Sequence, residues 1–379
     1  MNNKKKATWK QVLTTALVML LCAGCVFLMT RYFTLYVGSD AMPDNVILFF
    51  AVYCAAVFAA IYLQLIIHEG GHLIFGLLSG YRFTSFRIGS LMWIKQNGNI
   101  KCKKLSIAGT AGQCLMGPPD MKDGKIPVVL YNFGGSILNA ITGIGFVGLS
   151  FSMRNVPILA VLFPLLAAFG FILAFTNGIP MRTGTVDNDG YNAISVSRSS
   201  EAMRSFWLQL KVNEQMAQGV RLRDMPADWF TVPSDEAMKN SLTAVMGVFA
   251  CNRLMDEGSY EEADALMEHL LKIESGMMGL YRNLLVCDRM YLELTAANRA
   301  EVIEKMLDKQ QKRFMKQMKS FPSVLRTAYA YALLGEKDVA KAERIKAQYE
   351  KQMKAYPYPT DAQAERALME RAEKLSVNA

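Results

Sequence analysis

Residues 46–75 read VILFFAVYCAAVFAAIYLQLIIHEGGHLIF, and this stretch decides which kind of fold the chain can have. Its first 22 residues, 46–67, carry no charge, so as a helix they can cross the ~30 Å hydrocarbon core of a bilayer. Two of the chain's three histidines, His68 and His72, follow at the end of this run, with Glu69 between them. The stretch therefore predicts a membrane-spanning helix that ends in a cluster of ionisable side chains.

Three more runs lack charged residues and are long enough to span a bilayer: 12–30, 126–153 and 156–181, with 19, 28 and 26 residues. An amphipathic helix of a soluble protein would place charges on its exposed face within this length. We therefore expect four membrane-spanning helices, in which glycines such as Gly134, Gly135, Gly145 and Gly148 let neighbouring helices approach closely. The first run continues past Cys25, which favours a retained signal anchor over a cleaved or lipidated leader.

The formal net charge of the 379-residue chain is +9, and almost all of this excess lies in its first half. Residues 1–189 contain 15 Lys/Arg and 7 Asp/Glu, whereas residues 190–379 contain 27 and 26. The excess flanks the apolar runs, as in membrane proteins that orient by their basic loops. It does not form the basic folded domain typical of nucleic-acid binders, so we expect no nucleic-acid partner.

The distribution of basic residues also predicts the orientation of the spans. Lys4, Lys5, Lys6 and Lys10 precede the first run, and segment 79–125 holds eight Lys/Arg and two Asp. Loop 38–45 has two Asp and no Lys or Arg. Because basic loops stay in the cytoplasm, we expect a multi-pass cell-membrane protein whose N-terminus and C-terminus are both cytoplasmic.

The spacing of His68 and His72 predicts a metal site. A helix places side chains at i and i+4 on one face, so both imidazoles can bind one ion, and Glu69 beside them can accept a proton from water. The alternative is a pair of hydrogen-bonded core histidines, but ionisable groups inside a membrane are costly and mark functional sites. Gln64, one turn before His68 on the same face, can support the site.

A catalytic zinc needs a third protein ligand and an open position. His269 lies in a charged helical segment, where a solvated face is expected. Asp189, followed by Gly190, ends a loop that returns the chain to the membrane face of His68, and Asp187 competes with it by proximity. The alternative for both aspartates is an Asx-type turn.

The motifs together resemble the site-2 protease family of intramembrane zinc metalloproteases. They are an H-E-x-x-H at a helix end, a G-x-x-x-N helix, an N-x-x-P loop and a D-G pair, which stand here as residues 68–72, 135–139, 177–180 and 189–190. The resemblance covers roughly residues 46–193 and departs from the family in two ways. Ser136 stands where the family commonly has proline after the glycine, and the interval from Asn177 to Asp189 is long, which keeps Asp187 open.

What the resemblance implies is a set of residue roles. His68, His72 and Asp189 would bind Zn²⁺, Glu69 would be the general base, and Asn139 would bind the substrate backbone or the oxyanion. The resemblance also implies a bacterial plasma membrane as the location.

Segment 83–107 predicts a β-hairpin, because Asn97-Gly98 is flanked by β-type residues at 91–95 and 100–104. The hairpin either lies on the membrane surface or offers a strand edge to an extended substrate segment.

From residue 200 onward the pattern is that of amphipathic helices. Segments 254–271, 291–307 and 331–347 resemble one another, and their turns lie about 38 residues apart. This fits a short solenoid loosely similar to tetratricopeptide repeats, which either docks a protein partner or is a plain helical domain.

The expected fold is thus an α-helical polytopic membrane protein with a small membrane-surface hairpin and a tetratricopeptide-like cytosolic domain. Its parts are listed in chain order: a basic N-terminus (1–11), a first transmembrane helix (12–36), a protease-like core (46–193, with spans 46–78, 126–153 and 156–181 and hairpin 83–107) and a helical domain (200–379).

The expected function is that of a zinc metalloendopeptidase in the lipid bilayer. It would hydrolyse a peptide bond of a membrane protein or peptide, in a transmembrane or signal-type segment near the cytosolic face, for regulated intramembrane proteolysis or peptide maturation. The alternative is a catalytically inactive scaffold of the same fold whose helical domain holds a partner. A transporter is disfavoured because polar residues are not spread through several spans.

Overall fold

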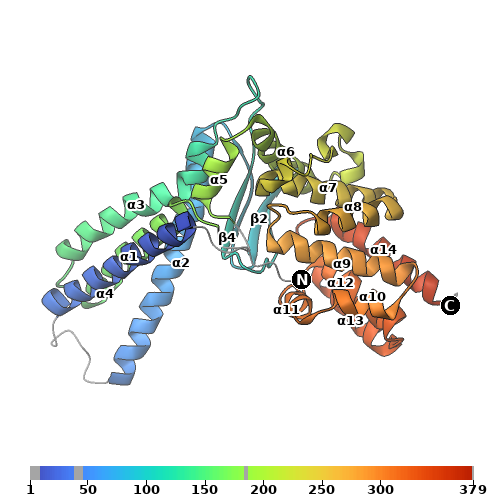
Figure 1. Cartoon of the computed structure of the whole chain (residues 1–379). Coiled ribbons are helices and arrows are strands. Elements are labelled where there is room, and N and C mark those ends of the chain that lie inside the picture. The colour runs from blue at the N-terminus through green and yellow to red at the C-terminus, as the bar shows by residue number, and fades with distance from the viewer. Residues whose placement is uncertain (1–8, 38–45, 183–186, 378–379) are drawn as a thin grey trace. The chain divides into compact units, whose positions relative to one another are not determined.

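A computed structural model describes residues 9–37, 46–182 and 187–377 of the chain. The protein is mostly helical with one small antiparallel sheet (Figure 1). It divides into two compact units. The first contains residues 9–37, 46–81, 127–182 and 187–194, and the second contains residues 82–126 and 195–377. The predicted basic residues Lys4–Lys6 and the predicted outer loop 38–45 lie outside the described residues.

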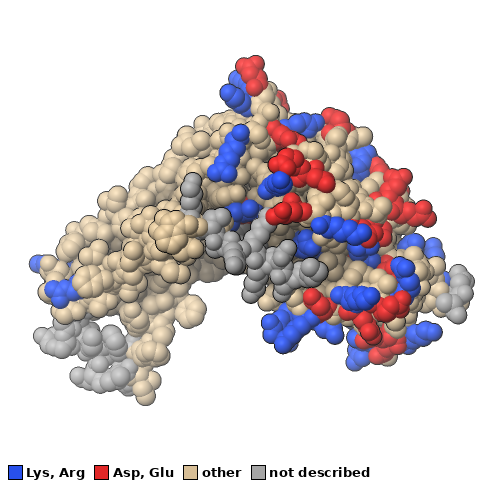
Figure 2. Space-filling view, viewed as in Figure 1, with Lys and Arg blue, Asp and Glu red and all other residues tan. Residues whose placement is uncertain are grey.

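The first unit is built from four long apolar helices: α1 (Trp9–Tyr32), α2 (Val46–Leu78), α3 (Val129–Ser152) and α4 (Pro157–Gly178). A short π-helical turn, η1 (Phe33–Val37), extends α1. All four helices are long and apolar enough to cross a membrane, as the uncharged runs predicted. Figure 2 shows Lys, Arg, Asp and Glu gathered over the second unit, while the visible surface of the long helices is nearly free of them.

Small residues set the packing within the first unit. Helix α3 packs against both α2 and α4, and α1 packs against α4. A Cβ added at Gly71 of α2 would lie 2.2 Å from the Gly134 carbonyl oxygen of α3, so the two backbones touch. At Gly145 and Gly148 an added Cβ would meet nothing within 4 Å. Close approach therefore occurs at Gly134, near the histidines of α2, and also at Gly143, where an added Cβ would lie 3.3 Å from the Phe171 ring of α4.

The sheet belongs to the second unit and has four antiparallel strands in the order β3-β2-β1-β4. Its strands are β1 (Arg82–Ile88), β2 (Leu91–Gln96), β3 (Asn99–Lys104) and β4 (Gly112–Gly117). The predicted hairpin is confirmed as β2 and β3, with φ of 50° at Asn97 and 80° at Gly98 in the turn. The flanking strands β1 and β4 were not predicted.

One face of the hairpin is buried against the C-terminal end of the chain. Met92 and Ile94 of β2 share a core cluster with Tyr356 and Tyr358. The Gln96 side chain donates a hydrogen bond to the Pro357 carbonyl at 2.7 Å, and the Lys104 amide donates one to the Ala355 carbonyl at 2.8 Å. The hairpin belongs to the same compact unit as the C-terminal helices. Its location at the membrane surface stays a prediction.

The rest of the second unit is helical. Helix α5 (Asp189–Val196) begins in the first unit and ends in the second. The elements that follow are α6 (Ser200–Ala217), η3 (Leu222–Asp224), η4 (Ala227–Phe230), η5 (Ala237–Lys239), α7 (Ser241–Glu257), α8 (Tyr260–Lys272), α9 (Gly279–Thr295), α10 (Ala300–Met306), α11 (Lys309–Gln317), α12 (Pro322–Ala330), η6 (Tyr331–Gly335), α13 (Val339–Met353) and α14 (Pro359–Val377).

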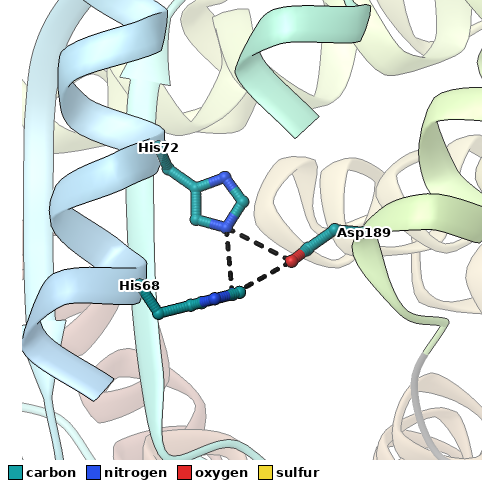
Figure 3. A group of neighbouring side chains, drawn as sticks. All are labelled: His68, His72 and Asp189. Atoms are coloured by element: carbon teal, nitrogen blue, oxygen red, sulfur yellow. Dashed lines mark hydrogen bonds and ion pairs between the residues drawn. The ribbon is translucent and has the colours of Figure 1, made fainter. Parts of the chain in front are cut away.

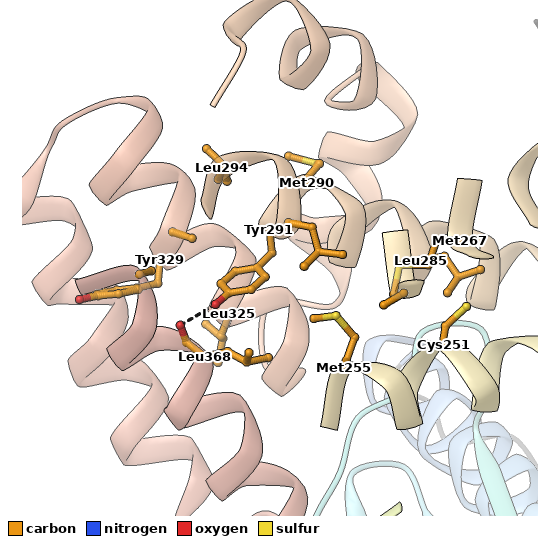
Figure 4. Packing of buried hydrophobic residues seen from close by; sticks show 14 of the residues in the cluster. Cys251, Met255, Met267, Leu285, Met290, Tyr291, Leu294, Leu325, Tyr329 and Leu368 are labelled. Carbon is orange, nitrogen blue, oxygen red and sulfur yellow. Dashed lines mark hydrogen bonds between the residues drawn. The ribbon is translucent and has the colours of Figure 1, made fainter. Parts of the chain in front are cut away.

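The three similar sequence segments fall on helix–turn–helix elements, at α7–α8, α9–α10 and η6–α13. Their apolar faces meet in one core that includes Met255, Met290, Tyr291 and Leu325, and the Tyr291 hydroxyl donates a hydrogen bond to the Leu368 carbonyl at 2.8 Å (Figure 4). A tetratricopeptide-like solenoid stays a prediction.

A buried guanidinium lies beside this core. Arg326 of α12 is 1% exposed and donates hydrogen bonds to the carboxylates of Asp288 on α9 and Glu365 on α14. Its guanidinium carbon lies 4.4 Å from the centroid of the Tyr291 ring. Because two carboxylates share one cation in this interior, the cluster carries a net negative charge when both are ionised.

Candidate metal centre

Two helix ends bring three side chains together. His68 and His72 stand one turn apart on the same face of α2, with their Nε2 atoms 3.3 Å apart. Asp189, the first residue of α5, points its Oδ2 between them, at 3.1 Å from His68 Nε2 and 3.3 Å from His72 Nε2 (Figure 3). Both imidazoles are buried, with exposures of 5% and 8%. The face-sharing that the i,i+4 spacing predicted is confirmed.

The spacing of these three atoms fits a tetrahedral metal ion. Zinc binds nitrogen and oxygen ligands at ~2.0–2.1 Å, so neighbouring ligand atoms of a tetrahedral site lie about 3.3–3.4 Å apart. The three observed separations are 3.1, 3.3 and 3.3 Å. The group of His68, His72 and Asp189 could therefore hold a metal ion.

The opposite nitrogen of each imidazole also fits this assignment. His68 Nδ1 lies 2.6 Å from Asn139 Oδ1, and His72 Nδ1 lies 2.8 Å from the Tyr131 carbonyl oxygen. Because each acceptor requires a hydrogen on Nδ1, the two Nε2 atoms of the neutral rings present lone pairs to each other and to the Asp189 carboxylate. Three electron-rich atoms at such distances repel one another unless a cation lies between them.

The third member of the group is Asp189 rather than Asp187 in this geometry. Asp187 Oδ1 accepts a hydrogen bond from Arg182 Nε at 3.0 Å, whereas Asp189 faces the histidines. The ionised carboxylate of Asp189 is the form that can bind a metal.

Asn188 fixes the position of Asp189, and the sequence analysis did not single it out. Its Oδ1 accepts hydrogen bonds from the amides of Met181 and Tyr191, both at 2.9 Å. Its Nδ2 donates to the carbonyls of Thr176 at 2.8 Å and Ile179 at 2.6 Å. One side chain thus caps the start of α5 and ties it to the end of α4. The turn-forming string Asp-Asn-Asp-Gly at 187–190 was the available signal.

Glycines of the motifs allow the backbones to meet at the site. A Cβ added at Gly135 would lie 2.6 Å from Cε1 of the His68 ring, so this imidazole lies directly on the α3 backbone. A Cβ added at Gly190 would lie 2.2 Å from the Gly178 carbonyl oxygen, where α5 begins beside the end of α4. Each of these two glycines is required by a close approach at its own position.

Two further residues named by the sequence analysis lie in or near this group. Glu69 is buried on α2, with 6% of its surface exposed. Asn139 is fully buried on α3, where its amide contacts His68 and Gln64. His269 lies apart from the centre and pairs with Asp235 at 2.8 Å.

A comparison with protein families supports the motif reading. Residues 41–186 match the family described as Peptidase M50B-like, whose members are typically metal-dependent. The matched range contains His68, His72 and Asn139 and ends three residues before Asp189, so the third member of the group is supported by geometry alone. No curated protein and no solved structure matches the chain. Residues 41–186 therefore match the model of the M50B-like peptidases, of the site-2 protease family that the motifs predicted.

Proposed function

We propose that this protein is an intramembrane zinc metalloendopeptidase, which hydrolyses a peptide bond in a transmembrane or signal-type segment near the cytosolic membrane face. The observation that carries the proposal is the convergence of His68 Nε2, His72 Nε2 and Asp189 Oδ2 on one point beside an apolar helix. The match of residues 41–186 to a peptidase family supports the same reaction class.

In this proposal His68, His72 and Asp189 hold Zn²⁺. The bound ion supplies a Lewis acid for the peptide carbonyl and makes water a stronger nucleophile near neutral pH. Glu69, one residue from His68 and buried, takes the proton of the attacking water and delivers it to the departing amine. Removal of Glu69 should therefore abolish turnover while leaving the three metal ligands in place.

The depth of the site fits cleavage near one membrane face. His68 stands 22 residues after Val46, about 33 Å along the helix at ~1.5 Å per residue, close to the ~30 Å thickness of the hydrocarbon core. With the orientation predicted by the basic loops, this end of α2 is cytosolic, in a multi-pass bacterial cell-membrane protein with both termini in the cytoplasm. A substrate helix must unwind there, because its peptide bonds are otherwise hydrogen-bonded within the helix.

The second unit suits a regulatory or docking role in the same proposal. Its helices present a charged surface that is distinct from the apolar spans (Figure 2), and a protein partner or the substrate's cytosolic tail can bind there. An inactive scaffold is less well supported, because Glu69 and the complete His68, His72 and Asp189 group are all present.

The proposal is tested by co-expressing the full chain with membrane peptides encoded near its gene and following their cleavage. Cleavage should occur with the unmodified chain and vanish with Glu69→Ala and with His72→Ala. The purified Glu69→Ala protein should retain one zinc per chain, whereas His72→Ala should lose it. A purified wild-type chain that binds no transition metal, or an active Glu69→Ala variant, would contradict the proposal.

A further inference from the structure

The amide of Asn139 is fully engaged within the protein. Its Oδ1 lies 2.6 Å from His68 Nδ1. Its Nδ2 lies 2.7 Å from Gln64 Oε1 and 3.0 Å from the Gln64 carbonyl oxygen, so both amide hydrogens have acceptors. Asn139 has no exposed surface. The amide hydrogens of Asn139 could therefore bind a substrate only if a buried hydrogen bond were broken.

Gln64 continues the chain of hydrogen bonds to a third helix. It is also fully buried, and its Nε2 donates to the Leu166 carbonyl of α4 at 2.7 Å. A Cβ added at Gly170 would lie 3.0 Å from Gln64 Nε2, so a glycine of α4 makes room for this side chain. The hydrogen bonds therefore run from the α4 backbone through Gln64 and Asn139 to the His68 ring.

Backbone carbonyls can only accept hydrogen bonds, and they fix the direction of every bond in this series of hydrogen bonds. The Leu166 carbonyl requires the amide nitrogen of Gln64, which turns Gln64 Oε1 toward Asn139. The Gln64 carbonyl and Oε1 both require the amide nitrogen of Asn139, which turns Asn139 Oδ1 toward His68. Oδ1 in turn requires a hydrogen on His68 Nδ1. The ring is thereby held in the form whose Nε2 lone pair faces His72 and Asp189.

We propose that Gln64 and Asn139 are positioning residues that set the tautomer and orientation of His68, and that Asn139 does not contact the substrate. The inference rests on the metal site of the proposed function, and it assigns to Asn139 a role different from the substrate contact that the family resemblance implied. Outer partners of metal-binding histidines typically contribute ~10–100-fold in metal affinity.

The first test is zinc affinity, measured by chelator competition on the purified full-length chain in detergent micelles. Gln64→Leu and Asn139→Leu should each weaken zinc binding about 10–100-fold. Ser150→Ala is the control, since Ser150 is a buried polar residue of α3 that bonds to the Phe146 carbonyl of its own helix.

The second test reads the tautomer directly. The chain has three histidines, so ¹⁵N-histidine labelling gives few signals, and the metal-free protein at pH 8 should show His68 with its hydrogen on Nδ1. Asn139→Leu removes the acceptor that holds this hydrogen, so the hydrogen of His68 should move at least partly to Nε2, where Asp189 can accept it.

The outcomes separate the inference from the proposed function. Equal zinc affinity in wild type, Gln64→Leu and Asn139→Leu, or an unchanged tautomer in Asn139→Leu, would overturn the inference while leaving the protease intact. Loss of turnover in Asn139→Leu with unchanged zinc affinity would indicate that Asn139 contacts the substrate. This result would also overturn the inference. A wild-type chain without zinc affinity would overturn the proposed function, and the tautomer measurement would still decide the inference.

Discussion

At the scale of single residues, helical periodicity predicts that His68 and His72 lie on one face of a helix, but it does not predict the position of Asp189. Two positions four apart in a helix share a face whatever the rest of the fold does. The carboxylate of this group stands at the end of a loop, where side-chain directions follow no period, so the motif favoured Asp189 but left Asp187 open. Asn188 separates them, because its four hydrogen bonds fix the backbone at the start of α5.

Removal of each aspartate in turn should distinguish the ligand from its neighbour. Asp189→Ala deletes one of three ligand atoms and should lower zinc affinity by more than the ~10–100-fold expected for an outer partner. Asp187→Ala breaks the pair with Arg182 and should leave zinc bound. Elemental analysis of the two purified variants checks this, and the reverse pattern would move the third ligand to Asp187.

Asn188 should matter for both stability and metal binding. Asn188→Ala removes the cap of α5 and the two bonds to the end of α4, so we expect a loss of about 1–2 kcal/mol in the free energy of unfolding and weaker zinc binding. Asn188→Ser keeps a side-chain oxygen that can accept from the Tyr191 amide and should lose less. Denaturant titration with zinc competition measures both effects; equal behaviour of the two variants would argue against the capping role.

At the scale of elements, the four long helices and the β2–β3 hairpin followed directly from runs of uncharged residues and from Asn97-Gly98. Strands β1 and β4 did not, because β1 begins directly after α2 and β4 is a short run bounded by glycines, which disfavour strands. Close packing of α2 and α3 was expected from glycine content, but only contacts in space show that Gly134 touches another helix while Gly145 does not.

The two glycines between His68 and His72 should respond differently to alanine. At Gly71 the new methyl group would meet the Gly134 backbone and force α2 and α3 apart, which should cost about 1–3 kcal/mol of stability and reduce zinc occupancy. At Gly70 nothing lies within 4 Å, so Gly70→Ala should be neutral or stabilising by up to ~1 kcal/mol. Thermal unfolding of both purified variants tests this difference, which should vanish if the contact is unimportant.

At the scale of the whole molecule, the sequence predicted a helical cytosolic region but not that the sheet would belong to it. The contact of β2 with Tyr356 and Tyr358 joins residues more than 250 positions apart, and neither propensity nor periodicity reports such pairings. Residues 91–94 of β2 are all apolar, so only the structure shows that Met92 and Ile94 face the core.

The buried cluster of the second unit predicts that its stability depends on pH. Burial outweighs the attraction of Arg326 and raises the pKa of Glu365 to about 7, and burial likewise raises the pKa of Asp361 to about 6. A raised pKa means that the folded state binds the proton more tightly than the unfolded chain. Stability should therefore fall as pH rises from about 4.5 to about 7 and level off above this range.

The measurement is the midpoint of thermal unfolding followed by tryptophan fluorescence, because Trp93, Trp207 and Trp229 all lie in the second unit. The midpoint should be higher at pH 5.5 than at pH 8. Glu365→Gln should flatten this dependence, since its amide does not titrate. An equally steep profile in Glu365→Gln would assign the effect to other groups.

The packing of β2 against Tyr356 and Tyr358 means that this strand stays uncovered during part of the chain's synthesis. Tyr356 follows Met92 by 264 residues, so at ~5–20 residues per second the ribosome needs about 13–50 s to supply the side chains that cover the strand. During this interval the apolar face of the nascent sheet is not yet covered by its final partners. A holding chaperone that recognises extended apolar segments should therefore associate with ribosome-bound chains that stop short of residue 356, and should release once the last helix has emerged.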